Sequence, residues 1–429
     1  GRVRNPVKGA IAFSGRNGRV PADLTALEPI LRRSKVAVSM SLGRIFIFFG
    51  VIVGLTFGTH YYLWARLIRD PMLPSPWRQA ATLALVVLAF SIPASMMAWR
   101  LLPRNVAIPV SWVGYIWMGS MFLLLVLLWG GEVARWSWVK YASLTSVDGG
   151  RREFLAQLLA GGAGVLGLAL SGWGVWSAVR PVEVKRVPVR LRKLPPSMSG
   201  LRLVQLSDVH VGLTIGRDFV EDVVRKVNAL EPDIVAITGD LIDGSVDDLG
   251  PAVAPLGDIQ ASLGTYFVTG NHEYYSGADS WLDFLGTLGI RALRNERVDL
   301  EKNGETIQLA GVDDWTAHQF GNGHGADVRR ALDGRDDAKP VILLAHQPVQ
   351  FAEAREQGVD LQISGHTHGG QIFPFGVLTR LVQPFLSGLH RRGDSQIYVS
   401  SGTGYWGPPM RIAAPAEITL LELDSEASA

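Results

Sequence analysis

The stretch LQISGHTHGGQIFPFG, residues 361–376, places two histidines two positions apart directly after a short apolar run. The chain of 429 residues has only nine histidines, and two of them lie in this short stretch. Taken alone, the segment fits either a glycine-rich turn or a pair of metal ligands at the end of a strand. The sequence around it decides between these two interpretations.

From Gly200 onward, short runs rich in Val, Ile and Leu alternate with amphipathic stretches, which predicts an α/β domain. Five of these runs end in polar residues that can bind metal ions. In chain order they carry Asp208 and His210, Gly239-Asp240 with Asp243, Gly270-Asn271-His272-Glu273, His346, and His366 with His368. Side chains two apart in a strand project to the same side, so we expect each pair to face one point if the backbone stays extended.

The residue types in these runs indicate a particular kind of metal site. Carboxylate, imidazole and amide oxygen suit divalent first-row ions, and the chain has no cysteine to supply sulfur. Seven candidate ligands exceed what one ion with an open position needs, and one carboxylate could bridge two ions. Such a pair activates water and holds both oxygens of a phosphoryl displacement. Each motif is weak alone, but open α/β sheets bind ligands at these strand ends.

In this order the motifs resemble those of the calcineurin-like metallophosphoesterase family, over about residues 201–423. The forms GHTHGGQ and SGTGYWGPPMRIAAPAEITLLEL are similar to a bacterial membrane-associated subgroup that includes a UDP-2,3-diacylglucosamine pyrophosphatase. The resemblance implies a two-sheet αββα sandwich. It also implies hydrolysis of a phosphate ester by metal-activated water, with two divalent ions (Mn, Fe or Zn) as cofactors.

The resemblance further implies a role for each site residue. The first ion would be held by Asp208, His210, Asp240 and His368. The second would share Asp240 and be completed by Asn271, His346 and His366. The catalytic residues would be Asp240, as the bridging ligand, and His272. His272 would bind no metal, but would protonate the leaving oxygen or stabilise charge in the transition state.

Four long segments that precede the α/β part contain no Lys, Arg, Asp or Glu: residues 45–65, 80–98, 106–131 and 154–179. Each is close to the ~20 residues with which a helix crosses the hydrocarbon core. The sequence therefore predicts an all-α transmembrane domain of about four helices. The expected organisation is a basic arm at 1–39 that could lie outside the native chain, membrane helices at 40–180, a basic proline-bearing linker at 181–199, and the phosphoesterase domain at 200–425.

The expected location is the cell membrane, with several spans and an extracytoplasmic catalytic domain. Arg151-Arg152-Glu153-Phe154-Leu155 resembles a twin-arginine export signal, although ordinary basic residues beside a membrane helix would look similar. Six basic residues between Arg180 and Lys193 oppose this orientation. The net charge of +2 favours no nucleic-acid partner, so the expected partners are the bilayer and a phosphate ester, which could be amphiphilic.

Two alternatives to a simple phosphoesterase stay open at this point: a pyrophosphatase acting on a nucleotide-activated lipid such as UDP-2,3-diacylglucosamine, and a non-enzymatic membrane scaffold with a vestigial fold. The apolar segment IFPFGVLTRLVQPFLSGLHRR, residues 372–392, bears on the substrate. Pro374 and Pro384 make it a poor continuous helix. It could pack on the core of its own domain, or it could be a flap that holds acyl chains.

Overall fold

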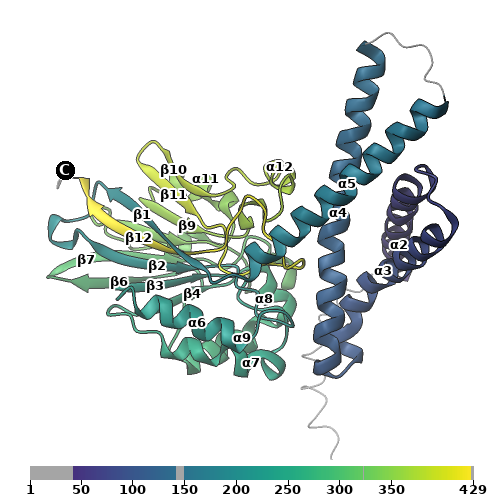
Figure 1. The fold of residues 1–429 in the computed structure, drawn as a ribbon. Helices are drawn as coiled ribbons and strands as arrows, with labels where there is room; N and C mark the ends of the chain where they lie inside the picture. The colour runs from purple at the N-terminus through teal and green to yellow at the C-terminus, as the bar shows by residue number, and fades with distance from the viewer. Residues whose placement is uncertain (1–41, 142–148, 322, 427–429) are drawn as a thin grey trace, which may run out of the picture. The chain divides into compact units, whose positions relative to one another are not determined.

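The computed structural model describes residues 42–141, 149–321 and 323–426 (Figure 1). Its first part is helical and consists of α2 (Leu42–Trp64), α3 (Ser75–Leu101), α4 (Arg104–Tyr141) and α5 (Gly149–Val179). Within the described residues, three helical stretches are long and apolar enough to cross a membrane: Ser75–Ala98, Arg104–Trp138 and Gly150–Val179. They correspond to the last three predicted spans. The first predicted span corresponds to α2 and stays a prediction.

The helical part buries little of its apolar surface. Large side chains such as Leu83, Trp129 and Leu168 are more than half exposed. A soluble helix would turn such residues toward a core, because exposed apolar area is costly in water. Exposure along several helices is instead what contact with hydrocarbon permits, since lipid tails are as apolar as leucine.

The second part contains two six-stranded sheets (Figure 1). The first sheet has the strand order β1 (Glu183–Leu191), β12 (Glu417–Ser425), β2 (Leu201–Leu206), β3 (Ile234–Thr238), β4 (Thr265–Val268) and β5 (Arg291–Ala292). The second has the order β10 (Gly388–Arg392), β11 (Ser395–Val399), β9 (Leu361–Ser364), β8 (Val341–Leu344), β7 (Glu305–Gly311) and β6 (Glu296–Lys302). Strands β2 to β5 run parallel, as do β7, β8, β9 and β11.

Successive side chains of a strand project to opposite faces of its sheet, and this alternation forms the layers of the sandwich. In β2, Leu203 packs between the sheets with residues such as Ile342 of β8, whereas Val204 belongs to the cluster on the outer face. That outer face is covered by α6 (Arg217–Asn228), α7 (Val246–Val253) and α9 (Ala278–Thr287) (Figure 1). The second sheet packs outward on α10 (Val328–Ala331) and α11 (Phe351–Glu356). The predicted αββα sandwich is therefore confirmed.

The predicted linker at 181–199 is wrong in part, because residues 183–191 form β1. This strand pairs in parallel with β12 over nine residues, and Val187, Val189 and Leu191 are buried. Its basic and proline-bearing composition, which suggested a linker, also suits an edge strand. Pro188 has no backbone N–H, and an edge strand does not need to donate one on its open side. Charged side chains on this strand disfavour pairing with another chain. The strands of the α/β part thus begin at Glu183. The predicted arm at 1–39 lies outside the described residues.

Candidate metal centre

The predicted site residues lie at the carboxyl ends of parallel strands from both sheets. Strands β2 and β3 of the first sheet end at Leu206 and Thr238, and β8 and β9 of the second end at Leu344 and Ser364. Each is followed within four residues by its ligands: Asp208 and His210, Asp240, His346, and His366 with His368. After β4, Asn271 and His272 open the short helix α8 (Asn271–Ser276). Both sheets therefore contribute side chains to one edge.

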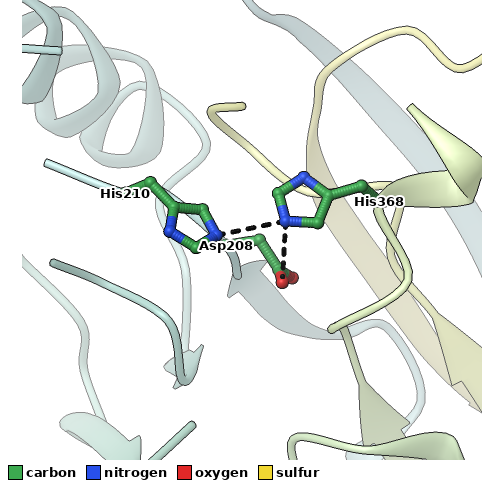
Figure 2. Close-up of side chains that lie close together, drawn as sticks. All are labelled: Asp208, His210 and His368. Carbon is green, nitrogen blue, oxygen red and sulfur yellow. Dashed lines mark hydrogen bonds and ion pairs between the residues drawn. The ribbon is translucent and has the colours of Figure 1, made fainter. Parts of the chain in front are cut away.

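One group of side chains consists of Asp208, His210 and His368. Their ligand atoms lie within 4.8 Å of one another. Figure 2 shows the two imidazole rings pointing at each other, with His210 Nε2 and His368 Nε2 3.1 Å apart and Asp208 Oδ1 3.4 Å from His368 Nε2. Burial lowers the pKa of His368 well below its usual range, so this ring is neutral and offers a lone pair.

A second group consists of Asp240, His346 and His366, also within 4.8 Å. His366 Nδ1 lies 3.2 Å from His346 Nε2, which lies 3.3 Å from Asp240 Oδ2. Asp240 also approaches the first group, because its Oδ2 is 3.8 Å from His210 Nε2. The carboxylate that the sequence suggested as a bridge is thus the one between the groups, and His366 and His368 fall into different groups.

The residues present fit divalent metal ions. His346 donates its Nδ1–H to the carbonyl of Thr238 at 2.8 Å, which leaves Nε2 directed into the site, as metal-binding histidines usually are. Burial lowers the pKa of His346, but the charges of Asp240 and Asp208 outweigh it and raise this pKa well above its usual value. The buried carboxylates therefore favour a positive charge at this point. Asn271 lines a cavity together with His210, Asp240 and His366, and its buried Oδ1 has no hydrogen-bond partner among the described residues.

His272 lies beside the ligands and is held by Asp243. Its Nδ1–H donates to Asp243 Oδ1 at 2.6 Å, and the same oxygen lies 3.2 Å from His210 Nδ1. Burial lowers the pKa of His272, but the hydrogen bond to Asp243 and the charge of Asp240 outweigh it and raise this pKa to about 9. A protonated imidazole next to a metal centre can donate a proton to a leaving oxygen. Asp243 appeared in the sequence motif, but only the structure shows which groups it orients.

The backbone does not bring the ligands together in the way expected from extended strands. Asp208, His210, Asp240, His366 and His368 all have left-handed conformations, with φ between 50 and 71°. They are five of the eleven described non-glycine residues with positive φ. Each such conformation costs of order 1–3 kcal/mol and is typical of functional sites. The chain therefore turns sharply after each strand, and the condition of an extended backbone is not met.

Two further residues support this geometry. Glu273 is fully buried and accepts hydrogen bonds from the backbone N–H groups of Asp240, Leu241 and Gly270 at 2.9, 2.8 and 2.6 Å. Gly365 precedes His366 at a point where a Cβ would overlap the side chains of Ser207 and Asp208. Both residues hold the loops close together, so that the backbone N–H of His366 donates to Asp208 at 2.9 Å.

Aromatic residues that sequence reasoning did not identify lie beside His272. The rings of Tyr275 and Trp406 have centroids 5.4 and 5.6 Å from that of His272, in edge-on arrangements. Trp406 lines a cavity of about 640 Å³ that contains His272 and most of the ligands. The sequence around Trp406, which is rich in glycine and proline, does not predict its contact with His272, because that contact depends on how loops from distant strands meet.

Comparisons with known proteins match these observations. Residues 201–370 match the family model described as calcineurin-like phosphoesterase. A transmembrane protein with metallophosphoesterase domain from Bos taurus is 42% identical over 331 residues, which is 73% of this chain and 74% of that protein. An uncharacterised metallophosphoesterase from Campylobacter jejuni is 33% identical over 384 residues, covering 88% of this chain and 99% of that protein. Among solved structures, a dimetal phosphatase from Danio rerio covers 48% of this chain with 15% identity and a TM-score of 0.31.

Proposed function

Because this chain belongs to the calcineurin-like phosphoesterases, a family of metal-dependent phosphoester hydrolases, we propose that it hydrolyses a phosphate ester beside a membrane with two divalent metal ions. The ions would be Mn, Fe or Zn, which all accept nitrogen and oxygen ligands. The observation that carries the proposal is the pair of ligand groups that meet at Asp240, with His272 3.9 Å from the same carboxylate.

The site residues of this chain would have separate roles. Asp208, His210, Asp240 and His368 would hold one ion, and Asp240, Asn271, His346 and His366 the other. Bound divalent ions in such a centre activate water and neutralise charge on the phosphoryl oxygens. His272 would deliver its proton to the leaving oxygen, and Asp243 would keep the ring protonated and aimed at the site.

The helical part supports a membrane location for this chemistry. Three described helices have the length and composition of membrane spans, and the bovine relative is named a transmembrane protein. The form GHTHGGQ at residues 365–371 supports the proposal that the chain belongs to the membrane-associated subgroup. The substrate would then be a phosphomonoester or phosphodiester close to the bilayer.

The side of the membrane is proposed from Arg151 and Arg152, which lie in the first turn of α5. If the pair is an export signal, the sandwich that follows α5 faces outward. A reporter fused after residue 423 would then be active only outside the cytoplasm, and replacing both arginines with lysine would stop its export. Reporter activity in the cytoplasm with the native pair present would contradict this orientation.

The function is tested with a substrate panel on the purified full-length protein in detergent. We expect hydrolysis of an aryl phosphate or an aryl phosphodiester once Mn²⁺, Fe²⁺ or Zn²⁺ is supplied, and metal analysis should show bound ions. Faster cleavage of a nucleotide-activated lipid at its pyrophosphate would favour the pyrophosphatase alternative. Bound metal without turnover of any substrate would favour a scaffold.

A further inference from the structure

The cavity that contains the candidate metal centre changes character along its length. One end is formed by polar side chains of the centre, including His210, Asp240 and His272. The other end is mostly apolar: it contains Met118, Phe122, Ile372, Phe375, Leu378 and Val382, with Thr379 and Gln383 beside the last two. Its volume of about 640 Å³ is typical of sites for small ligands. A ligand that fills it must be polar at one end and apolar at the other.

Part of the apolar wall comes from a candidate membrane span. Met118, Gly119 and Phe122 belong to α4, within the apolar stretch Arg104–Trp138. Phe122 meets Phe375 edge-on, with ring centroids 6.2 Å apart. Gly119 allows a close approach, because a Cβ there would lie only 2.6 Å from Met410 Sδ. The wall is therefore formed by a helix and by the loops that follow the metal ligands.

The loop at residues 406–412 is fixed to both α4 and α5. Leu123 of α4, Ile372 and Met410 form one buried cluster. The backbone N–H of Arg411 donates to the carbonyl of Gly174 in α5 at 2.9 Å. These contacts tie the loops around the metal centre to the helices, so that the apolar end of the cavity is a packed part of the fold.

The hydrogen bond between Arg411 and Gly174 also indicates where the loop at residues 406–412 lies along α5, which is a candidate membrane span. From Arg152, in the first turn of α5, to Gly174 the helix rises ~33 Å at 1.5 Å per residue. That length is close to the ~30 Å thickness of the hydrocarbon core. The loop at residues 406–412, whose Trp406 and Pro408 line the cavity, thus meets α5 about one membrane thickness from the arginine pair.

Opposite α4, the cavity is bordered by α12 (Phe375–Thr379) and by the residues directly before and after this helix. The ends of this segment are anchored, because Ile372 and Phe385 are buried. Between them lies an exposed apolar patch of six residues: Phe373, Phe375, Val377, Leu378, Leu381 and Val382. Continuous exposed apolar surface of this kind marks a site of interaction with a ligand, a protein or a membrane. The segment is thus packed at its ends and open in its middle.

We propose that the substrate is a membrane lipid whose phosphate ester binds at the metal centre while its acyl chain lies between α4 and α12. This inference rests on the proposed phosphoesterase function and assigns its substrate class. With metal ions bound at the polar end, the charge of the phosphate would be matched there, and the acyl chain would cover the apolar wall. Because α4 is itself a candidate span, the chain can pass from the bilayer into the cavity without crossing water.

The first test compares neighbouring residues of α12 that differ in whether they line the cavity. Leu378 lines it and Val377 does not, although the two side chains are 54% and 60% exposed. In the full-length protein, Leu378→Ser should lower the ratio of kcat/KM for dioleoyl phosphatidate in mixed micelles to kcat/KM for a soluble aryl phosphate by about tenfold. Val377→Ser should leave this ratio unchanged. An equal fall in both variants would mean that α12 merely touches the micelle, and would overturn the proposal.

The second test locates the acyl chain without turnover. A lipid phosphonate, which cannot be hydrolysed, carries a diazirine near the end of its chain and is photolysed with the full-length protein in nanodiscs. We expect labels within Met118–Phe122 and Phe375–Val382 that excess phosphatidate removes. Labels confined to the separate apolar cavity of about 810 Å³ near Leu127 and Trp138 would reflect bulk lipid and would overturn the proposal.

The two proposals fail in different ways. A metal-loaded protein that cleaves neither phosphatidate nor the aryl phosphate contradicts the phosphoesterase function itself. A protein that cleaves the aryl phosphate with metal, but shows no competed label on α4 and no difference between Leu378→Ser and Val377→Ser, retains the function and lacks the lipid site.

Discussion

The two ends of the active-site cavity are built by opposite means. Behind the polar end, Asp208 and His346 are fully buried; Asp208 has a left-handed backbone, and the His346 ring is held by its hydrogen bond to Thr238. At the apolar end, Leu378 and Val382 are exposed and belong to a short helix. Strain and burial fix atoms within tenths of an ångström, which chemistry needs, whereas an acyl chain needs only apolar area. Changes at the polar end should therefore slow every substrate, and changes at the apolar end should alter the choice among substrates.

The largest effect is expected at Asp240, which belongs to the second ligand group and lies 3.8 Å from His210 of the first. Asp240→Asn removes the charge that would hold two cations together, so turnover should fall by about 10⁴-fold or more on lipid and soluble substrates alike, since each ion supplies several kcal/mol. Metal analysis should show fewer than two ions per chain. A variant that keeps two ions and retains near-native turnover would show that Asp240 does not bridge.

His272→Ala should give the next largest effect. Loss of the proton donor predicts a fall in kcat of roughly 10²–10⁴-fold, again on both substrates. Metal content should stay native, because this residue is not among the proposed ligands. Loss of both ions in the variant would instead make His272 a ligand.

A smaller effect of 10–100-fold in kcat, typical of residues that support a metal site, is expected for Asp243→Asn. Its signature is the pH profile. Activity that depends on protonated His272 is lost as pH rises through the pKa of that ring, which Asp243 and Asp240 raise to about 9. Removing the charge of Asp243 lowers this pKa, so the alkaline limb should move to lower pH. An unmoved limb would exclude His272 as the titrating group.

The smallest effect is expected at exposed residues of the apolar segment that do not line the cavity, and it is measured on stability. Leu381 is 78% exposed, and Leu381→Ser should change the free energy of unfolding by no more than about 0.5 kcal/mol. Phe385 packs with Phe351, Ile397 and Val399, and Phe385→Ser should cost about 3 kcal/mol or more. Thermal unfolding of both variants measures this difference. Equal stability would mean that the segment is not anchored at Phe385.

The sequence predicted the polar end better than the apolar end. The ligands follow apolar runs of strand length, so their place at one edge of the sheets follows from the alternation of elements. The left-handed turns at Asp208 and His366 leave no trace in composition, because neither residue is a glycine. The composition of the edge strand β1 predicts a linker, because its charged residues and Pro188 give no sign that Val187 and Val189 are buried.

The segment at residues 372–392 stood out in the sequence as a possible flap, but the share of α4 in the apolar end could not be predicted, because it depends on contacts between distant segments. Nothing in the sequence of α4 distinguishes Met118 and Phe122, which line the cavity, from the other apolar residues of the same stretch. Similarly, Leu381 and Phe385 look alike in sequence, although one is exposed and the other is buried. Which apolar residue is covered is decided by the packing of loops on helices.

The central claim is a two-metal phosphoesterase, and a metal titration tests it most directly. Full-length protein is stripped of metal, titrated with Mn²⁺ and assayed at each step for hydrolysis of an aryl phosphate. Activity should be absent without metal and should saturate at two equivalents per chain. Activity in the metal-free protein, or saturation at a single equivalent, would contradict the claim.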